Sequence, residues 1–245
     1  MKARQFLIQS QYLNIKVYIV DKILKMLELQ QELNDATNGK GWEKGVTKNG
    51  KRIDWKRCTY LECAELIESY PWKHWKNIDA EPDYANIKIE AVDIWHFIMS
   101  QGLEDYKMKK LGDIKSLASH INTLPNFADF TTTATATNKN YYEQIEVVEI
   151  LMKNLFCQGS TQDIMKSFID IAMQSGLNLD ALYKLYVGKN ILNKFRQDHG
   201  YKDGTYIKIW NGKEDNVSMQ HILETEVNIT PEGLYDALSK AYPKG

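Results

Sequence analysis

Apolar residues recur with a period near 3.6 along most of this 245-residue chain, and only five prolines interrupt the pattern. That period places side chains on one face of an α-helix, whereas a half-buried strand would require strict alternation, which the sequence rarely shows. A chain of this length can bury about 70–75% of its unfolded surface, so a real core is available. The sequence therefore predicts a mostly helical protein of the all-α class.

The expected helices are separated by glycine, proline and polar residues that commonly end helices. They span residues 14–34, 54–69, 83–106, part of 107–126, 141–157, 161–175 and 178–197, followed by one near 216–226 or 231–242. The Thr-rich stretch at 131–140 has nothing to bury and is expected to be a mobile loop. The turn-rich stretch at 198–216 is either a flexible active-site lid or an ordinary surface loop.

Composition and charge exclude several classes of protein. Lys and Arg number 31 against 32 Asp and Glu, so the net charge is −1, and we expect neither a nucleic-acid partner nor a membrane partner. The three cysteines lack CxxC spacing, which argues against a disulfide framework and a zinc ribbon. No apolar run reaches about 18 residues, and the polar N-terminal segment is a poor signal peptide. A cytoplasmic location is therefore expected.

Two of the expected helices carry pairs of acids beside apolar residues. The segment IKIEAVDIWHFIMS at 87–100 is apolar on nearly all sides, and its interior acids are Glu90 and Asp93. A helix that is apolar all round is normally buried, so these acids should be buried or line a cleft. In the preceding helix, Glu62 and Glu65 lie one turn apart, although acids at this spacing are also common on solvated helices.

If the two pairs of acids face one another, their four carboxylates require neutralisation. At about 5–7 Å and an effective dielectric constant of about 20, each like-charge pair costs roughly 2–3 kcal/mol. Several pairs together are comparable with the whole stability of a domain, about 5–15 kcal/mol. Protonation would relieve the repulsion, but divalent cations would do so better. Oxygen ligands without cysteine suit Mg²⁺, with Mn²⁺ as a substitute, and such ions activate water and stabilise a leaving phosphate.

The first helix carries two amides where an apolar seam should continue. The seam consists of Val17, Val20, Leu24 and Leu27, and the next positions on that face are Gln31 and Asn34. One interpretation is that the amides line a site. The other is that the helix emerges into solvent at its end, since Gln and Asn are mostly exposed.

The helix expected at 178–197 offers fixed cations. Lys189, Asn193 and Arg196 share one face, and Asn190 lies beside them. Arg and Lys could hold phosphate oxygens there, with Arg acting as a bidentate fork. Alternatively, they form a solvated basic helix end, which the helix dipole favours.

Taken together, these motifs resemble the dimeric, all-α dUTPases of the MazG-like nucleoside triphosphate pyrophosphatase superfamily. The segments that carry the resemblance are LQQELND at 29–35, RCTYLECAELIESYPWKHWKN at 57–77, IEAVDIWHFIMS at 89–100 and the block from 176 to 216. The resemblance implies a single all-α domain over residues 1–245 with a MazG-like helical bundle. Residues 1–15 are then an extension without a counterpart in the family.

The resemblance also assigns roles to individual residues. The implied Mg²⁺ ligands are Glu62, Glu65, Glu90 and Asp93, and Glu62 or Glu65 would help to deprotonate the attacking water. Residues implied to line the uracil and deoxyribose pocket are Gln31, Asn34, Trp72, Trp75, His96, and Asn190 or Asn193. The implied phosphate contacts are Lys189, Arg196 and Lys202. The family further implies a homodimer, whose apolar interface would bury Val17, Val20, Leu24, Trp95 and Tyr186.

The expected reaction is the hydrolysis of dUTP to dUMP and pyrophosphate, with dUDP as a further substrate, which would keep uracil out of DNA. Three alternatives compete with it. The same fold could act as a broader dCTP or NTP house-cleaning pyrophosphatase, or the chain could be a non-catalytic nucleotide-binding module. A di-iron carboxylate bundle would need Glu-x-x-His on two helices, whereas this chain offers only Asp93-x-x-His96 in its acidic helices.

Overall fold

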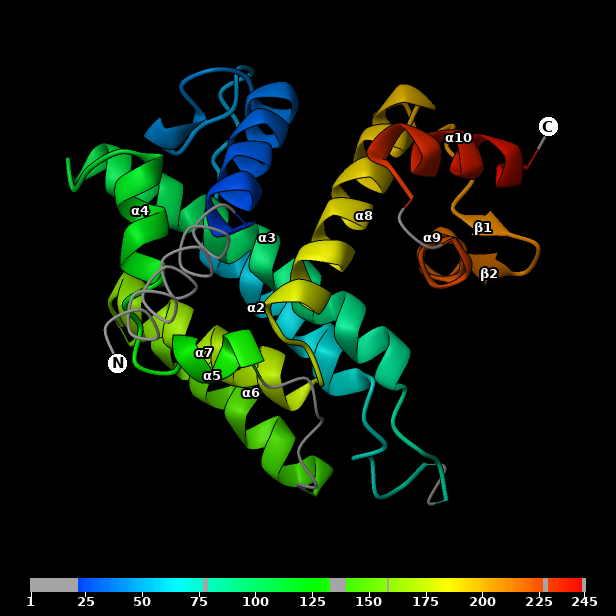
Figure 1. Ribbon diagram of the computed structural model, residues 1–245, viewed down its shortest axis with the longest axis horizontal. Coiled ribbons are helices and arrows are strands. Elements are labelled where there is room, and N and C mark those ends of the chain that lie inside the picture. The colour runs from blue at the N-terminus through cyan, green and yellow to red at the C-terminus, as the bar shows by residue number, and fades with distance from the viewer. Residues whose placement is uncertain (1–21, 77–78, 133–139, 158, 227–228, 244–245) are drawn as a thin grey trace, which may run out of the picture. The chain divides into compact units, whose positions relative to one another are not determined.

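The computed structural model describes residues 22–76, 79–132, 140–157, 159–226 and 229–243 (Figure 1). After a helix over residues 22–38, the elements are η1 (Trp42–Lys44), α2 (Trp55–Glu68), α3 (Tyr84–Met108), α4 (Ile114–Ile121), α5 (Phe127–Thr132), α6 (Tyr141–Phe156), α7 (Thr161–Gln174), α8 (Leu179–Asp198), β1 (Ile209–Trp210), β2 (Lys213–Glu214), α9 (Asp215–Thr225) and α10 (Pro231–Ala241). The predicted all-α class is confirmed. Within the described ranges, no helix is both long and apolar enough to cross a membrane.

The chain divides into two compact units, one ending at Tyr183 and the other comprising Lys184–Gly245. The boundary falls inside α8, so this helix contributes to both. The prediction of a single domain over residues 1–245 stays a prediction.

In the first unit, α2 and α3 form an antiparallel hairpin whose helices lie side by side (Figure 1). Asp54 caps α2 and Asp83 caps α3, because each carboxylate accepts a backbone N–H three residues later. The indole of Trp55, at the start of α2, stacks on Phe97 in α3 with ring centroids 6.1 Å apart. At the other end of α2, Ser69 accepts a hydrogen bond of 2.9 Å from the Asn86 side chain.

The central helix of the first unit is α3, which is buried on nearly all sides, as its sequence predicts. It packs against α2, η1, α4 and α7. The contact with α7 includes Trp95 stacked on Phe168, with ring centroids 4.6 Å apart. Because neighbouring helices cover α3 in this way, polar residues on it are held in place by the core.

The second unit contains the last part of α8, the β1–β2 hairpin, α9 and α10. The hairpin turns at Asn211 and Gly212, both of which have positive φ angles, and Asn-Gly is the dipeptide that favours such two-residue turns. Aromatic rings form much of the core, with Phe195 lying 5.9 Å from Trp210 and 5.4 Å from Tyr242 between ring centroids.

Three expected boundaries differ from the structure. The first helix ends at Asn38 rather than Asn34, because Gly39, with a φ of 90°, is the residue that adopts the left-handed conformation and closes the helix. Both C-terminal helices are present, rather than one of the two. Thr131 and Thr132, which were expected in a loop, end α5. The rest of that expected loop (133–139) and the expected extension at 1–15 lie outside the described residues.

Candidate active site

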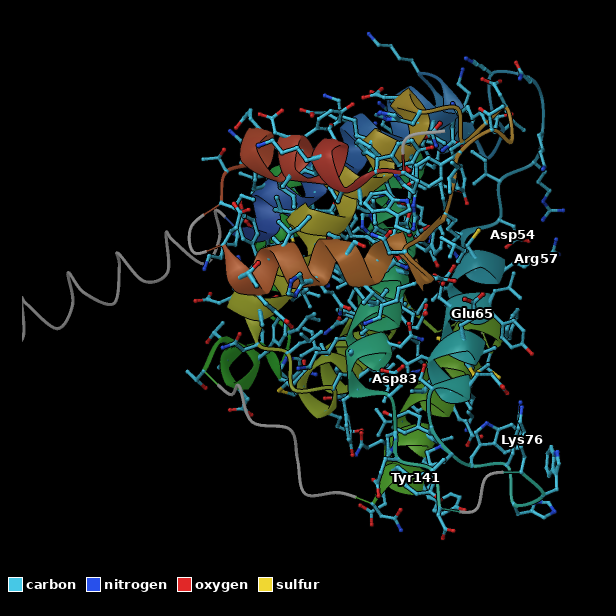
Figure 2. All side chains as sticks on the ribbon, turned by 90° about the vertical axis from the view of Figure 1, so that its right-hand side faces the viewer. Asp54, Arg57, Glu65, Lys76, Asp83 and Tyr141 are labelled. Carbon is cyan, nitrogen blue, oxygen red and sulfur yellow. The ribbon has the colours of Figure 1, made fainter. Side chains whose placement is uncertain are left out.

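Three of the four predicted metal ligands come together at the α2–α3 hairpin. Glu62 and Glu65 lie one turn apart on α2, and the antiparallel partner α3 supplies Glu90. One carboxylate oxygen from each lies within 4.8 Å of the other two. Glu90 is buried, Glu62 is half-buried and Glu65 is exposed, and Figure 2 labels Glu65 on α2. The cluster is therefore anchored in the core on one side and open to solvent on the other.

The donor set of this cluster fits a divalent cation. Three carboxylates so close together repel one another strongly when all are ionised. Hard oxygen ligands of this kind suit Mg²⁺, Mn²⁺ or Ca²⁺ rather than thiophilic metals. The negative charge of Glu62 also acts on its neighbours: burial raises the pKa of the Cys58 and Cys63 thiols, and Glu62 raises both further. The site therefore presents concentrated negative charge.

The fourth predicted ligand, Asp93, lies one turn further along α3 and is half-buried. It is not a member of the three-carboxylate cluster that the structure forms. A role for Asp93 as a metal ligand stays a prediction.

Further along α3 from Glu90, a buried network of hydrogen bonds joins this helix to the first helix. The His96 Nδ1 lies 2.7 Å from Gln30 Oε1, and the Gln30 Nε2 donates to Ser100 Oγ at 3.0 Å and to Asn34 Oδ1 at 3.3 Å. Asn34 Nδ2 also donates to Ser100 Oγ, at 2.9 Å. All four side chains are at most 4% exposed. Two of the predicted pocket residues, Asn34 and His96, are thus held in one network.

The predictions from sequence missed Gln30 and Ser100. The predicted seam passed through Leu24 and Gln31, but the buried face of the first helix carries Ile23, Met26, Leu27, Gln30 and Asn34. Ile23 and Met26 precede Gln30 by seven and four residues, which is the signal that could have identified it. Similarly, Ser100 follows His96 by four residues on α3.

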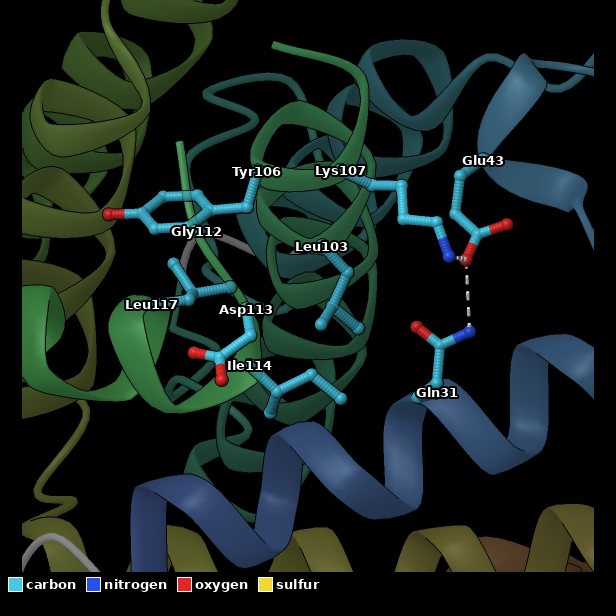
Figure 3. A pocket seen from close by; sticks show the side chains of 9 residues that line it. All are labelled: Gln31, Glu43, Leu103, Tyr106, Lys107, Gly112, Asp113, Ile114 and Leu117. Carbon is cyan, nitrogen blue, oxygen red and sulfur yellow. Dashed lines mark hydrogen bonds and ion pairs between the residues drawn. The ribbon is translucent and has the colours of Figure 1, made fainter. Parts of the chain in front are cut away.

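Gln31 points away from this network. Its Nε2 donates to Asp35 Oδ1 at 3.2 Å and to Glu43 Oε1 at 3.3 Å, and Glu43 also forms an ion pair with Lys107 at 3.5 Å. Gln31, Glu43 and Lys107 line one side of a pocket of about 390 Å³, and the other side contains Leu103 and further apolar residues (Figure 3). The structure therefore does not bring Gln31 together with His96, and its predicted contact with substrate stays a prediction.

The two predicted tryptophans lie together after the end of α2. The Trp72 and Trp75 rings meet edge to face with centroids 5.6 Å apart. Trp75 is 63% exposed, close in sequence to Lys76, which Figure 2 labels. An exposed indole of this kind can pack against an apolar ligand surface.

In the second unit, the predicted phosphate-binding residues have protein partners of their own. Arg196 donates from Nε and Nη2 to the two carboxylate oxygens of Asp215, each at 2.8 Å, and from Nη1 to Asn193 at 3.2 Å. Lys189, 3% exposed, donates to Asn216 at 2.9 Å. Asp215 and Asn216, which lie far from Arg196 along the chain, are not among the residues predicted from the sequence.

The remaining two predicted residues of this block differ in exposure. Lys202 is exposed. Asn190 is half-buried, and its Nδ2 is a buried donor that no described residue accepts from. Such a donor is costly unless something hydrogen-bonds to it. The binding roles of both residues stay predictions.

A family model described as dUTPase matches residues 22–201. This span includes the carboxylate cluster, the buried network and α8 through Arg196. The chain belongs to the dUTPase family. No match is found among curated proteins.

Membership of this family gives the activity in general terms. The protein is a dUTP diphosphatase with the all-α dUTPase fold, its substrate is a nucleotide, and its reaction depends on a divalent metal. Lys202, the β1–β2 hairpin and Asp215 lie beyond the matched residues. The acidic cluster of this dUTPase therefore lies within the residues that match the family model. Arg196 also lies within them, but its partner Asp215 does not.

Proposed function

We propose that this dUTPase requires Mg²⁺, accepts Mn²⁺ in its place, and converts dUTP to dUMP and pyrophosphate. We extend the proposal to dUDP, which would yield dUMP and phosphate. The observation that carries it is the meeting of Glu62, Glu65 and Glu90 within 4.8 Å. Oxygen ligands favour Mg²⁺ where substrate phosphates complete its coordination.

When bound, the divalent cation supplies Lewis-acid stabilisation of phosphate charge and favours ionisation of a water. Glu62, Glu65 and Glu90 would hold it, with Asp93 as a fourth ligand. Glu65 is exposed and Glu62 half-buried, so either carboxylate could accept the proton that the attacking water loses. The oxygen of that water forms a bond to one of the two phosphorus atoms that share the α–β bridging oxygen. The bond from that phosphorus to the bridging oxygen breaks, which yields dUMP and pyrophosphate.

The remaining residues are proposed to bind the nucleotide. Asn34 and His96 would contact the nucleoside, supported by the network that fixes both side chains. The further nucleoside contacts in this proposal are Gln31, Trp72, Trp75, Asn190 and Asn193, and the phosphate contacts are Lys189, Arg196 and Lys202. Because Arg196 already pairs with Asp215, it would bind phosphate either in place of Asp215 or in addition to it.

We also propose a cytoplasmic homodimer that removes dUTP from the nucleotide pool, without nucleic-acid or membrane partners. One reason given for the dimer from sequence requires correction. Trp95 and Tyr186 are buried within the chain itself, so they do not form an apolar surface that a second copy must cover. Leu24 is half-buried, and Val17 and Val20 lie outside the described residues. The dimer therefore rests on the family resemblance, and sedimentation of a single-chain species at micromolar concentration would contradict it.

A substrate panel tests the proposed reaction. The release of the corresponding nucleoside monophosphate is measured with dUTP, dUDP, dCTP and dTTP, in Mg²⁺, in Mn²⁺ and with a chelator. The proposal expects turnover of dUTP and dUDP that the chelator abolishes and that either metal restores, with dCTP and dTTP turned over far more slowly. Equal turnover of dUTP and dCTP would instead indicate the broader house-cleaning pyrophosphatase.

A further inference from the structure

Ser100 lies where the buried network converges, and its surroundings fix the direction of its hydrogen bonds. Its Oγ is 2.8 Å from the backbone oxygen of His96, 2.9 Å from Asn34 Nδ2 and 3.0 Å from Gln30 Nε2. A hydroxyl has one hydrogen to donate and two lone pairs to accept with, whereas a backbone carbonyl only accepts. The hydrogen of Ser100 therefore points to the His96 carbonyl, and both amides must donate to Oγ.

This direction determines how Gln30 faces His96. Since the amino group of Gln30 is turned toward Ser100, its oxygen is the atom that faces the His96 ring, with Oε1 2.7 Å from Nδ1. An amide oxygen can only accept, so Nδ1 must carry a hydrogen. A neutral imidazole carries one hydrogen. In the neutral ring, the other nitrogen, Nε2, is therefore an acceptor.

The same logic fixes the amide of Asn34. Its Nδ2 donates to Ser100, and its Oδ1 accepts from Gln30 at 3.3 Å. A flip of the amide would direct Oδ1 at a hydroxyl whose hydrogen points elsewhere, and Nδ2 at the Gln30 amino group. Both contacts are buried, and a buried polar group without a partner is costly.

We propose that Ser100 and Gln30 are positioning residues that preset the nucleoside-binding groups of this enzyme. They hold the His96 ring as the Nδ1–H tautomer, with Nε2 ready to accept from an N–H or O–H of the nucleoside, and they hold the Asn34 amide in one orientation. This inference rests on the proposed function, in which Asn34 and His96 contact the nucleoside. The donor on the ligand is either the imide N–H of uracil or the sugar hydroxyl.

The tautomer can be measured directly. The full-length protein, labelled with ¹⁵N in its five histidines, is studied by nitrogen NMR at about pH 8, above the ordinary histidine pKa of about 6.5. The His96 signals are assigned by their absence from the His96→Asn spectrum. We expect the wild type to carry its ring hydrogen on Nδ1. Without the Ser100 hydroxyl, the Gln30 and Asn34 amides can flip together, so in Ser100→Ala a population with the hydrogen on Nε2 should appear.

Two further variants control this experiment. Gln30→Met keeps Ser100 but removes the acceptor for Nδ1–H, and it should disturb the tautomer in the same way. Ser175→Ala is the matched control, because Ser175 is also buried and its hydroxyl also donates to a backbone carbonyl four residues earlier, at 2.9 Å. It should leave the His96 signals unchanged.

Kinetics connect the tautomer to the substrate. For Ser100→Ala, kcat/KM for dUTP should fall about tenfold or more, mainly through a higher KM, whereas Ser175→Ala should stay near the wild type. Dideoxy-UTP lacks the sugar hydroxyl, and N3-methyl-dUTP lacks the imide hydrogen. For the analogue that lacks the donor facing Nε2, kcat/KM should be the same in the wild type and in Ser100→Ala.

A wild-type hydrogen on Nε2, an unchanged tautomer in both network variants, or an altered tautomer with unchanged kcat/KM would overturn the inference. The first two results would leave the proposed reaction untouched. Conversely, a wild-type protein that does not turn over dUTP in Mg²⁺ would overturn the proposed function without affecting the tautomer measurement.

Discussion

Arg196 and Asp215 form a bidentate ion pair in the second unit, with two hydrogen bonds of 2.8 Å. Asp215 is fully buried and also accepts a hydrogen bond of 2.8 Å from the Tyr206 hydroxyl. Burial alone would raise the pKa of the Asp215 carboxyl. The hydrogen bonds and charge of Arg196, together with Tyr206, outweigh that effect and hold the pKa below its ordinary value. The pair joins α8 to the start of α9.

Asp215→Asn should destabilise the second unit by about 3–5 kcal/mol at neutral pH, since it leaves the Arg196 charge uncompensated. The pKa of Asp215 is lower in the folded state, so its stabilisation is fully present above the unfolded pKa of about 3.9 and disappears as the pH falls through the folded pKa. Thermal unfolding between about pH 7 and pH 3 checks this. Asp203→Asn, at an exposed position, is the control, and a variant at Asp215 as stable as wild type at neutral pH would contradict the prediction.

Glu104 should show the opposite pH dependence. Burial raises its pKa, and the charges of Asp105 and Asp54 add to this, although the neighbouring Trp55 side chain acts in the opposite direction. With a higher pKa in the folded state, the protein loses stability as the pH rises from the unfolded pKa, about 4.3, through the folded value. Glu104→Gln should therefore raise the melting temperature at neutral pH and change it less at about pH 4. Exposed Glu149→Gln should have no such effect, and a lowered melting temperature for Glu104→Gln would contradict the account.

Glu62→Gln should abolish turnover without harming the metal-free fold. Removal of one carboxylate relieves repulsion within the cluster, so the metal-free melting temperature should stay equal or rise. Turnover of dUTP should fall by about 100-fold or more, as expected when a metal ligand or base is lost. Glu68→Gln, on the same helix but outside the cluster, should keep its activity. A large loss of metal-free stability in Glu62→Gln would show that the acid is a structural ion-pair member instead.

Asn34→Ala should weaken discrimination between bases. Uracil presents one N–H donor between two carbonyl acceptors and cytosine reverses part of this pattern, so a fixed amide can distinguish them. We expect kcat/KM for dUTP to fall about 10–100-fold, with a smaller change for dCTP. Gln31→Ala, measured in parallel, tests whether the pocket near Glu43 also takes part. Equal losses for dUTP and dCTP in Asn34→Ala would rule out base reading by this amide.

Local patterns were sufficient to predict most helices of the first unit, but not α5, which lies between the expected helix within 107–126 and the expected loop at 131–140. Asp54 and Asp83 are capping residues just before the apolar periodicity begins, and Pro71 follows the end of α2. The meeting of Glu65 and Glu90 joins helices that follow one another along the chain, since α3 comes directly after α2 and packs against it. These features depend on residues that are close together in the sequence.

Other features depend on partners that are distant in the sequence. In the first helix, one apolar stripe can be drawn through Ile23 and another through Leu24. Only the packing against α3 determines that Gln30, rather than Gln31, faces His96. Likewise, nothing near Arg196 in the sequence indicates that Asp215 will accept both of its hydrogen bonds. The Asn211-Gly212 signal of the β1–β2 hairpin is local, although within the turn-rich stretch at 198–216 it does not by itself show which residues pair.

The central claim is that the three clustered glutamates bind the catalytic cation. Titration of the full-length protein with Mn²⁺, followed by electron paramagnetic resonance, measures this binding without substrate. Glu90→Gln should bind Mn²⁺ at least about tenfold more weakly than wild type, since even residues that only support a metal ligand contribute 10–100-fold to affinity. Equal Mn²⁺ affinity in the wild type and Glu90→Gln would contradict the assignment of this cluster as the metal site.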